Sequence, residues 1–208
     1  MTSASDLLPP RPSLPKLRDV ASTCKACELW RVGTQTVFGE GKSRARLMLV
    51  GEQPGDQEDR AGRPFVGPAG RLLDQSLEEA GADREDVYVT NVVKHFRWEP
   101  RGKRRIHRKP GLEHILACRP WLESELKVVK PNLVVCLGAT AAQAILGKSF
   151  RVTQQRGEVF DFEESYYSGL VTATVHPSSI LRAPSDRREE ERKSFVADLR
   201  KAIRKLAS

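Results

Sequence analysis

Two histidines, His95 and His107, lie in the basic stretch Lys94–Gly111, which directly follows the apolar run VYVTNVV. An imidazole can act as a metal ligand, a general base or a nucleophile, so either residue could carry chemistry. A basic run in a loop is more often solvated surface, and composition alone favours that interpretation here. The position of the stretch directly after an apolar strand keeps a functional role open for both histidines.

The cysteines offer a second kind of chemistry. Cys24 and Cys27 form a CxxC pair with no strand before it, which disfavours a thioredoxin-type redox motif and favours a metal site. A disulfide framework is not expected, because the sequence shows no secretory signal. Cys118 lies near a helix end, whereas Cys136 lies within an apolar strand, where a thiol packs as a small apolar side chain. The candidates for a fourth ligand are His95, His107, His114 and, less favoured, Cys136; spacing alone does not choose between His95 and His114.

Polar side chains also follow the apolar runs that we expect to be strands. The carboxyl ends of parallel strands meet at one edge of a sheet, and α/β proteins place their sites outside that edge. We therefore expect these side chains to lie along one rim. The expected rim residues are Glu52, Gln53, Asp56, Asn91, His95 and His176.

Some of these residue types suggest particular tasks. The amide of Asn91 offers donors and an acceptor, which suits reading the edge of a base, although a local turn cap is equally consistent. His176 precedes a proline, which holds it extended at the end of its strand, and the hydroxyls of Ser178 and Ser179 could bind phosphate. The turn around Glu52 is neither a dinucleotide fingerprint nor a P-loop, because the GxGxxG spacing and the GK[ST] sequence are both absent.

The elements that must position these residues alternate along the chain. Apolar runs predict strands over residues 46–52, 86–94, 132–137 and 170–175. Helical periodicity predicts helices over residues 67–81, 110–131 with an interruption at Pro120, 139–147 and 185–208. Strands that alternate with helices predict an α/β fold, with a parallel central sheet and helices on both faces.

Length and net charge indicate the number of domains and the type of binding partner. The 208 residues suffice for a single domain with a full core, and the formal net charge of +8 favours a polyanionic partner such as nucleic acid. No apolar run approaches the roughly 18 residues of a membrane span. We predict a Pro-rich, disordered lead-in over residues 1–20 and one folded domain over 21–208. The absence of a signal-peptide pattern predicts an intracellular, cytoplasmic protein, and nothing in the sequence suggests an obligate oligomer, so we expect a monomer.

Several motifs together resemble the uracil-DNA glycosylase superfamily, and in particular its iron–sulfur branch. They are GEQPGDQEDRAGRPFVGPAGRLLD, TNVVK, ACRPWL, LGATAA and TVHPSSILR, in that order along the chain. The sequence is most similar to the UdgX type, which is distinguished by GEQPG and by a KRRIH insertion, here Lys103–His107. The resemblance implies a uracil-DNA glycosylase-like fold and activity on uracil-containing DNA, single-stranded or double-stranded.

The resemblance also implies a cofactor. The usual iron–sulfur branch has a Cys-Arg-Pro run after TNVVK, and this chain has KHFRW at that point, so His95 falls where the branch places its third thiolate. A [4Fe–4S] cluster on Cys24, Cys27, His95 and Cys118 is therefore implied, and Cys136 is left to the core. A histidine ligand departs from the usual all-thiolate cluster.

Roles at the site follow from the same resemblance. Phe65 would stack on uracil and Asn91 would read its Watson–Crick edge, with Gln53 and Asp56 also in the uracil-binding set. His176 would donate to the O2 oxygen of the departing base. Arg105 would support the KRRIH loop through Glu52. The expected DNA-contacting residues are Lys103, Arg104, Ser178 and Arg182.

The KRRIH loop adds a reaction to ordinary base excision. UdgX-type proteins are known for a stable crosslink to DNA, and the resemblance implies that His107 attacks C1′ of the abasic site while Glu52 accepts the proton that His107 loses. The alternative is an ordinary glycosylase with many turnovers, in which Glu52 positions water and His107 only contacts phosphate. A metal-bearing DNA-binding module without catalysis and a thiol redox protein are more distant alternatives.

Overall fold

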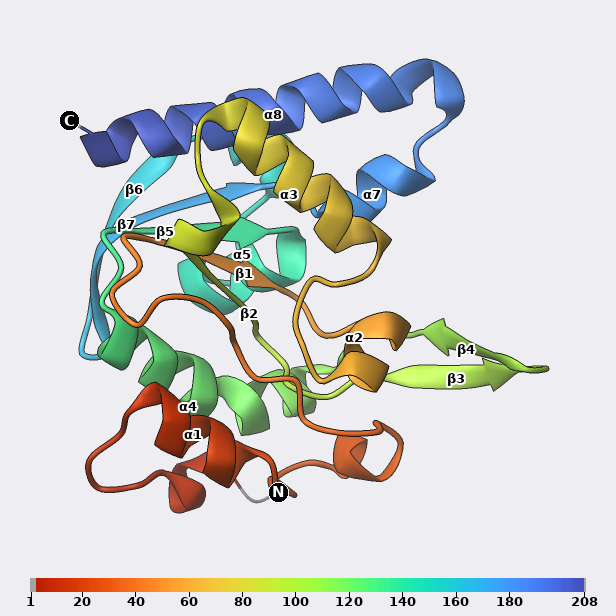
Figure 1. The fold of residues 1–208 in the computed structure, drawn as a ribbon, viewed down its shortest axis with the longest axis vertical. Helices are drawn as coiled ribbons and strands as arrows, with labels where there is room; N and C mark the ends of the chain where they lie inside the picture. The colour runs from red at the N-terminus through yellow and green to blue at the C-terminus, as the bar shows by residue number, and fades with distance from the viewer. Residues whose placement is uncertain (1–2, 208) are drawn as a thin grey trace.

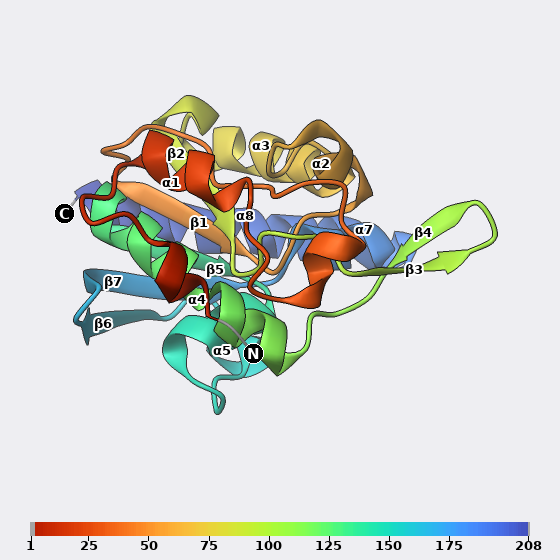
Figure 2. The same ribbon diagram turned by 90° about the horizontal axis from the view of Figure 1, so that it is seen from below.

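The computed structural model describes residues 3–207, which form a five-stranded sheet between two layers of helices (Figures 1 and 2). The strand order is β2-β1-β5-β7-β6, and the first four strands run parallel. Their bounds are β1 Leu47–Gly51, β2 Val87–Asn91, β5 Leu133–Leu137, β6 Val159–Glu164 and β7 Tyr167–Thr174. The predicted α/β fold with a parallel central sheet is confirmed.

Each face of the sheet has its own helices. One face is covered by α3 (Pro68–Ala80), α7 (Pro177–Arg182) and α8 (Ser185–Ala207), and the other by α1 (Leu14–Ala21), α4 (Leu112–Val129) and α5 (Ala139–Leu146). Alternate residues of a strand point to opposite faces. In β1, Leu47 and Leu49 accordingly pack with α3 and α8, while Met48 and Val50 pack with α4. The remaining short elements are η1 Ala4–Leu7, η2 Glu28–Arg31, α2 Asp56–Ala61, η3 Arg84–Asp86 and α6 Val152–Gln155.

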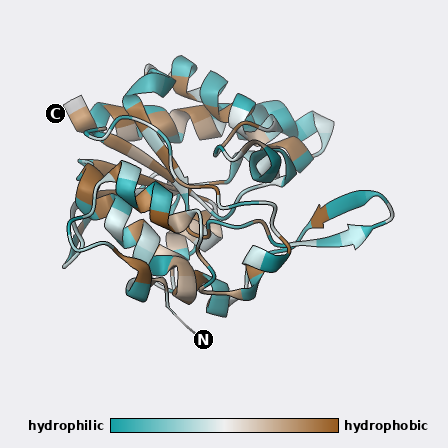
Figure 3. Cartoon of the chain, turned by 60° about the horizontal axis from the view of Figure 1, so that its bottom comes forward, coloured by the Kyte–Doolittle hydropathy of each residue, from teal (hydrophilic) through white to brown (hydrophobic). Residues whose placement is uncertain are grey.

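The basic stretch is not a loop. It forms an antiparallel hairpin of β3 (Trp98–Arg101) and β4 (Arg104–His107), which projects from the body of the molecule (Figures 1 and 2). Gly102 makes the two-residue turn possible, because its φ of +58° lies in the left-handed region. The hairpin is mostly hydrophilic (Figure 3), and its position therefore depends on polar anchors near its base rather than on an apolar core.

Three further elements differ from the sequence-based expectations. β6 was not predicted, and it pairs antiparallel with β7 at the edge of the sheet. α4 continues through Pro120, and Leu116, whose carbonyl loses its helical partner there, lies on the exposed side of the helix. In the predicted lead-in, residues 4–7 and most of α1 are helical where disorder was expected, because Leu14 and Leu17 bury their side chains in the core that contains α4. Within residues 3–207, no helix combines the length and apolar character needed to span a membrane.

Candidate active site

A cavity of about 690 Å³ opens at the carboxyl ends of the parallel strands. Four strand ends contribute to it, because Glu52 follows β1, Asn91 ends β2, Thr140 follows β5 and His176 follows β7. The hairpin adds His107 from the end of β4. The residues singled out from the sequence that line this cavity are Glu52, Gln53, Phe65, Asn91, His107, His176, Ser178 and Arg182.

Phe65 and Asn91 lie against the backbone of Gly51. A Cβ atom at Gly51 would stand 2.4 Å from Asn91 Oδ1 and 2.8 Å from Phe65 Cζ, so only glycine leaves room for both side chains. Phe65 itself has a φ of +56°, a strained conformation for a residue with a side chain. Gly70 of α3 maintains it by close approach, because a Cβ there would lie 1.7 Å from the Phe65 carbonyl oxygen. An aromatic face and an amide are thereby fixed at one end of the cavity.

His176 presents a proton donor to the same cavity. Its Nδ1 accepts a hydrogen bond of 3.1 Å from the backbone N–H of Ser178, at the start of α7. In the neutral ring the proton must therefore be on Nε2. Burial lowers the pKa of His176 to about 4, which keeps the imidazole neutral at neutral pH. The ring lies nearly parallel to Phe65, with 6.1 Å between the ring centroids.

Glu52 connects the sheet to the hairpin histidine. Thr140 donates its hydroxyl hydrogen to Glu52 Oε2, and His107 Nε2 lies 3.4 Å from Glu52 Oε1. Burial raises the pKa of Glu52, but the hydrogen bonds from His107 and Thr140 outweigh burial, and the net shift is downward. Glu52 is thus a carboxylate at neutral pH. His107 keeps half of its side-chain surface exposed, so its ring is accessible from solvent.

Gln53 holds both ends of the hairpin together. Its Nε2 donates to the carbonyl oxygens of Arg97 and Arg108 at 3.1 Å each, one before β3 and one after β4. Its Oε1 accepts from the backbone N–H of Arg97 at 3.3 Å. One side chain therefore fixes the base of the hairpin, and with it the position of His107, directly beside the cavity.

Arg105 anchors the hairpin from its other side. Its guanidinium pairs with Asp56 and, at 2.7 Å, with the fully buried Asp59. The same group lies 5.4 Å from the ring centroid of Trp98, in cation–π geometry. The expected partner of Arg105 was Glu52, and that expectation is wrong, because the side chain points to α2 and not into the cavity. Arg105 supports the loop from α2.

Some predicted site residues lie outside the cavity. Asp56, expected among the uracil-binding residues, faces Arg105 and Arg60 on the outer side of α2. Burial raises the pKa of Asp56, but the two guanidinium groups lower the pKa by a larger amount, so the net shift is downward. Lys103 and Arg104 occupy the exposed tip of the hairpin, away from the cavity.

The thiols of Cys24, Cys27 and Cys118 lie close enough to interact electrostatically, and His95 directly follows Lys94, which contacts Cys118. Trp121 Nε1 donates to Cys24 Sγ at 3.4 Å, and the backbone N–H of Lys94 donates to Cys118 Sγ at 3.2 Å. Such N–H···S contacts are a recurrent feature of metal-bound thiolates. Burial raises the pKa of Cys118 to about 12, so ionisation of this thiol depends on a compensating cation. Cys136 lies mid-strand in β5 and is fully buried in the apolar core, as expected.

The two candidate histidine ligands differ in which nitrogen is free. Thr36 Oγ1 gives its hydrogen to the Ala21 carbonyl, so it must accept from His95 Nε2, 3.0 Å away. Nδ1 of His95 therefore carries the lone pair that a metal needs.

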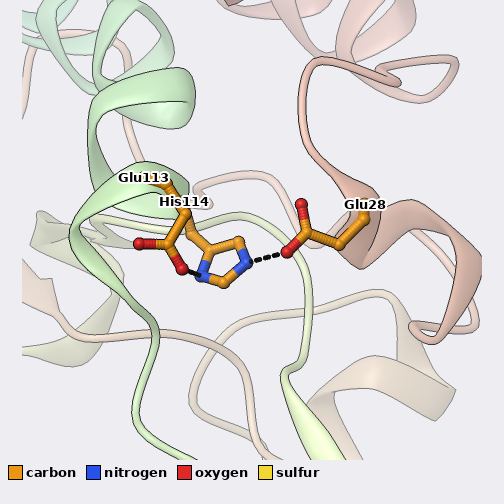
Figure 4. Close-up of side chains that lie close together, drawn as sticks. All are labelled: Glu28, Glu113 and His114. Carbon is orange, nitrogen blue, oxygen red and sulfur yellow. Dashed lines mark hydrogen bonds and ion pairs between the residues drawn. The ribbon is translucent and has the colours of Figure 1, made fainter. Parts of the chain in front are cut away.

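His114, in contrast, uses both ring nitrogens. Its Nδ1 accepts from the Gly111 N–H at 2.8 Å, and its Nε2 lies 2.6 Å from Glu28 Oε1 (Figure 4). Glu113 adds a second carboxylate at 3.2 Å from Nδ1. Because Glu28 directly follows Cys27, His114 joins the cysteine-bearing segment to the start of α4 and has no nitrogen left for a metal. Of the two histidines, only His95 therefore keeps a ring nitrogen free.

Sequence reasoning missed several residues of the cavity. Thr140, which orients Glu52, is the polar residue of LGATAA after β5, and its position after a strand was a usable signal. Glu58 is buried beneath the cavity, where its carboxylate accepts from the N–H groups of Gly55 and Gly67 and shapes the turns around Phe65. Glu58 stands three residues after the N-cap Gly55, which is the local spacing of a capping box, but its contact with Gly67 depends on the packing of α2 against the following turn.

The buried state of His176 predicts a pH-dependent stability. The pKa of His176 is about 4 in the fold and near 6.5 in an unfolded chain, so between these pH values the unfolded chain binds the extra proton. The contribution of His176 to the free energy of unfolding is therefore complete above pH 6.5. It is lost as the pH falls towards 4, by up to about 1.4 kcal/mol per pH unit. Urea unfolding at a series of pH values measures the slope. His176→Gln, which does not titrate, should show a shallower slope, and an identical slope would contradict this assignment.

Comparison with known proteins gives the family. The sequence model of the Uracil DNA glycosylase superfamily matches residues 38–200. A type-4 uracil-DNA glycosylase of Sulfurisphaera tokodaii is 37% identical over 200 residues, which is 94% of this chain and 85% of the relative. A type-4 uracil-DNA glycosylase of Thermotoga maritima is 40% identical over 180 residues, 86% of this chain and 87% of the relative. A type-5 uracil-DNA glycosylase of Pyrobaculum aerophilum is 31% identical over 187 residues, 81% of this chain and 77% of the relative. These matches span the sheet and the cavity together, and the chain belongs to the uracil DNA glycosylase superfamily.

Proposed function

We propose that this protein releases uracil from DNA by cleaving the N-glycosidic bond of deoxyuridine. The observation that carries the proposal is the convergence of Phe65, Asn91 and His176 on one cavity, with Gly51 leaving room for the first two. The relatives named uracil-DNA glycosylases support the same activity. A base within a duplex is inaccessible to this cavity, so the nucleotide must be flipped out or taken from single-stranded DNA.

The side chains have distinct roles in bond cleavage. Phe65 stacks on the flipped base, and the Asn91 amide pairs with its polar edge. As the C1′–N1 bond breaks, negative charge develops on uracil. The Nε2–H of neutral His176 donates to the O2 oxygen and stabilises that charge. Removal of one preorganised donor of this kind costs about 3–4 kcal/mol of transition-state stabilisation.

We propose further that His107 captures the sugar, as in UdgX-type proteins. Departure of uracil leaves an electrophilic C1′, and a lone pair of the neutral imidazole forms an N–C1′ bond. The resulting imidazolium then loses a proton. Glu52 can receive it, because its ionised Oε1 lies 3.4 Å from His107 Nε2. The anchoring of the hairpin by Gln53 and Arg105 supports this role, since it holds His107 at the cavity before DNA binds.

An ordinary glycosylase with many turnovers is the second candidate. It is favoured by the position of Glu52 inside the cavity, where a carboxylate can direct water to C1′. In that case His107 would contact phosphate only. The two candidates share the uracil pocket and differ in the product that remains bound to DNA.

One experiment separates the two candidates. The protein is incubated with labelled single-stranded DNA that contains one deoxyuridine, and free uracil and denaturing-gel mobility are measured on the same samples. We expect uracil release together with a slower DNA band that survives heat and detergent. Uracil release without that band would support the ordinary glycosylase. Absence of uracil release from both single-stranded and duplex DNA would contradict the proposed function.

The ligand set fits an iron–sulfur cluster, and we propose [4Fe–4S] on Cys24, Cys27, His95 and Cys118. The N–H donors to two of the sulfurs and the free Nδ1 of His95 support this assignment. When bound, a cluster would join the segment after α1, the end of β2 and α4 in one covalent unit. Iron and acid-labile sulfide in anaerobically purified protein test the proposal, and stoichiometric zinc without iron would contradict it.

A further inference from the structure

A second cavity lies between α4 and α5 and has a volume of about 310 Å³. Its walls are mainly apolar and include Leu116 and Leu122 from α4 and Ile145 from α5. Leu112 and Leu116 leave 51% and 53% of their surface exposed, more than the other large apolar residues among residues 3–207. A cavity of this size is at the lower end of the range for small-ligand pockets, about 300–1,000 Å³. It has room for a group as small as a nucleobase.

This cavity adjoins the proposed uracil pocket. Lys109 and Thr140 line both cavities, so a single row of side chains separates them. Lys109 follows His107 by only two residues, and the Thr140 hydroxyl holds Glu52. A DNA strand with one nucleotide in the uracil pocket therefore has a neighbouring nucleotide beside this second opening.

The rim of the second cavity carries cations suited to phosphate. Lys109 and Lys148 are exposed at its edge, and Arg119 is held by Glu123 at 2.7 Å over the ring of Tyr166. Single-strand binding grooves combine cations that follow the backbone with aromatic side chains that contact base faces. Here the cations are present at the rim, and Tyr166 and the apolar floor offer the contact surface. Glu123 is neutralised by Arg119, so the rim remains net positive.

We propose that this groove binds the nucleotide next to the target deoxyuridine, on one side of it, in the same strand. The proposal rests on the proposed function, because it places the target base in the adjoining pocket. The base of the neighbouring nucleotide lies on Leu112 and Leu116, and Lys148 approaches a backbone phosphate. The groove thus anchors the strand beside His107 and makes substrate affinity depend on one flank more than on the other.

Three single-stranded substrates test the groove. One carries deoxyuridine in the middle, one carries it at the 5′ end with only a 3′ flank, and one carries it at the 3′ end with only a 5′ flank. Uracil release is measured with excess enzyme in a single turnover, which gives the maximal rate and the half-saturating enzyme concentration separately. This design is insensitive to any covalent product that stops turnover.

Two groove variants and one control complete the design. Leu116→Asp should raise the half-saturating concentration about tenfold for the central substrate and for one of the two end substrates, with an unchanged maximal rate. Lys148→Gln should reduce the slope of log affinity against log salt by about 0.7 on the same two substrates. Lys127→Gln removes another exposed charge, at the far end of α4, and should change neither quantity. Thermal melts confirm that each variant is folded.

The outcomes are distinguishable. An effect confined to one flank supports the groove. Equal effects on both end substrates, or no effect on any substrate while the wild type releases uracil, would overturn the groove and leave the proposed function intact. A groove that binds a partner protein instead of DNA would give no effect of the variants on any substrate. A wild-type protein that releases no uracil from the central substrate would contradict the proposed function and the groove together.

Discussion

Replacement of His107 by alanine is expected to abolish the heat-stable protein–DNA band while uracil release continues. The variant keeps the elements that bind the base and stabilise its departure, since Asn91 and His176 lie at other strand ends and Phe65 lies in the turn before α3. It lacks the imidazole that faces Glu52 at the end of β4. Water can then reach C1′ beside Glu52, and the product becomes an abasic site. The measurement is uracil release and denaturing-gel mobility on one sample, with an expected loss of crosslink of at least about 100-fold.

A matched control lies on the same hairpin. Arg104→Ala removes a charge at the exposed tip and leaves His107, Gln53 and Arg105 in place, so the crosslink should persist. A crosslink that survives His107→Ala would assign the nucleophile to another residue. Loss of uracil release in His107→Ala would mean that the imidazole is required for cleavage of the glycosidic bond itself.

The largest effect on stability is expected at a buried ion pair outside the cavity. Lys94 and Glu125 expose 1% and 0% of their side chains and bond to each other. The ammonium also donates to Thr90 Oγ1 at 2.6 Å and to the Asn91 carbonyl at 2.7 Å. Lys94→Met leaves the Glu125 carboxylate without its counter-ion in the core. We expect the free energy of unfolding to fall by about 3–5 kcal/mol, measured by urea unfolding.

Two further variants test whether the loss of stability in Lys94→Met comes from the unpaired charge of Glu125. The double variant Lys94→Met with Glu125→Leu removes both charges and should recover most of the lost stability, because no uncompensated charge remains buried. Lys42→Met breaks the exposed pair with Asp86 and should leave the unfolding midpoint unchanged. A double variant as unstable as the single one would show that Lys94 acts through packing and not through charge.

This ion pair also connects the base-binding side of the cavity to the segment that carries His95. Lys94 lies between Asn91, which we propose to read the base, and His95, which we propose to bind the cluster. Its backbone N–H donates to Cys118 Sγ, while Glu125 accepts from Tyr88 and from the backbone of Gly39. The turn after β2 is therefore held from both sides. Partial uracil release in Lys94→Met at low temperature would be consistent with a role in positioning rather than in catalysis.

The sequence predicted the central sheet well because parallel strands are buried on both faces. The runs 47–51 and 133–137 are apolar throughout, which is typical of parallel strands buried on both faces. The hairpin was not predictable in the same way, because β3 and β4 are rich in arginine and carry few residues that favour strands. Gln53 and Arg105 stabilise it through contacts with segments more than 40 residues away.

Local periodicity in the sequence determined the order of the four parallel strands and the helices between them, and hence which side chains follow strand ends and share a rim. That inference needs only local periodicity and the geometry of parallel sheets. The tertiary structure decided what each of those side chains faces. It turned Asp56 and Arg105 towards each other and away from the cavity, fixed the protonated nitrogen of His95 and His176, and left both nitrogens of His114 occupied. The partners of Arg105, of His95 and of His114 Nε2 come from distant segments and are placed only when the layers pack. The N–H that fixes the His176 ring is local, since it belongs to Ser178, two residues along the chain.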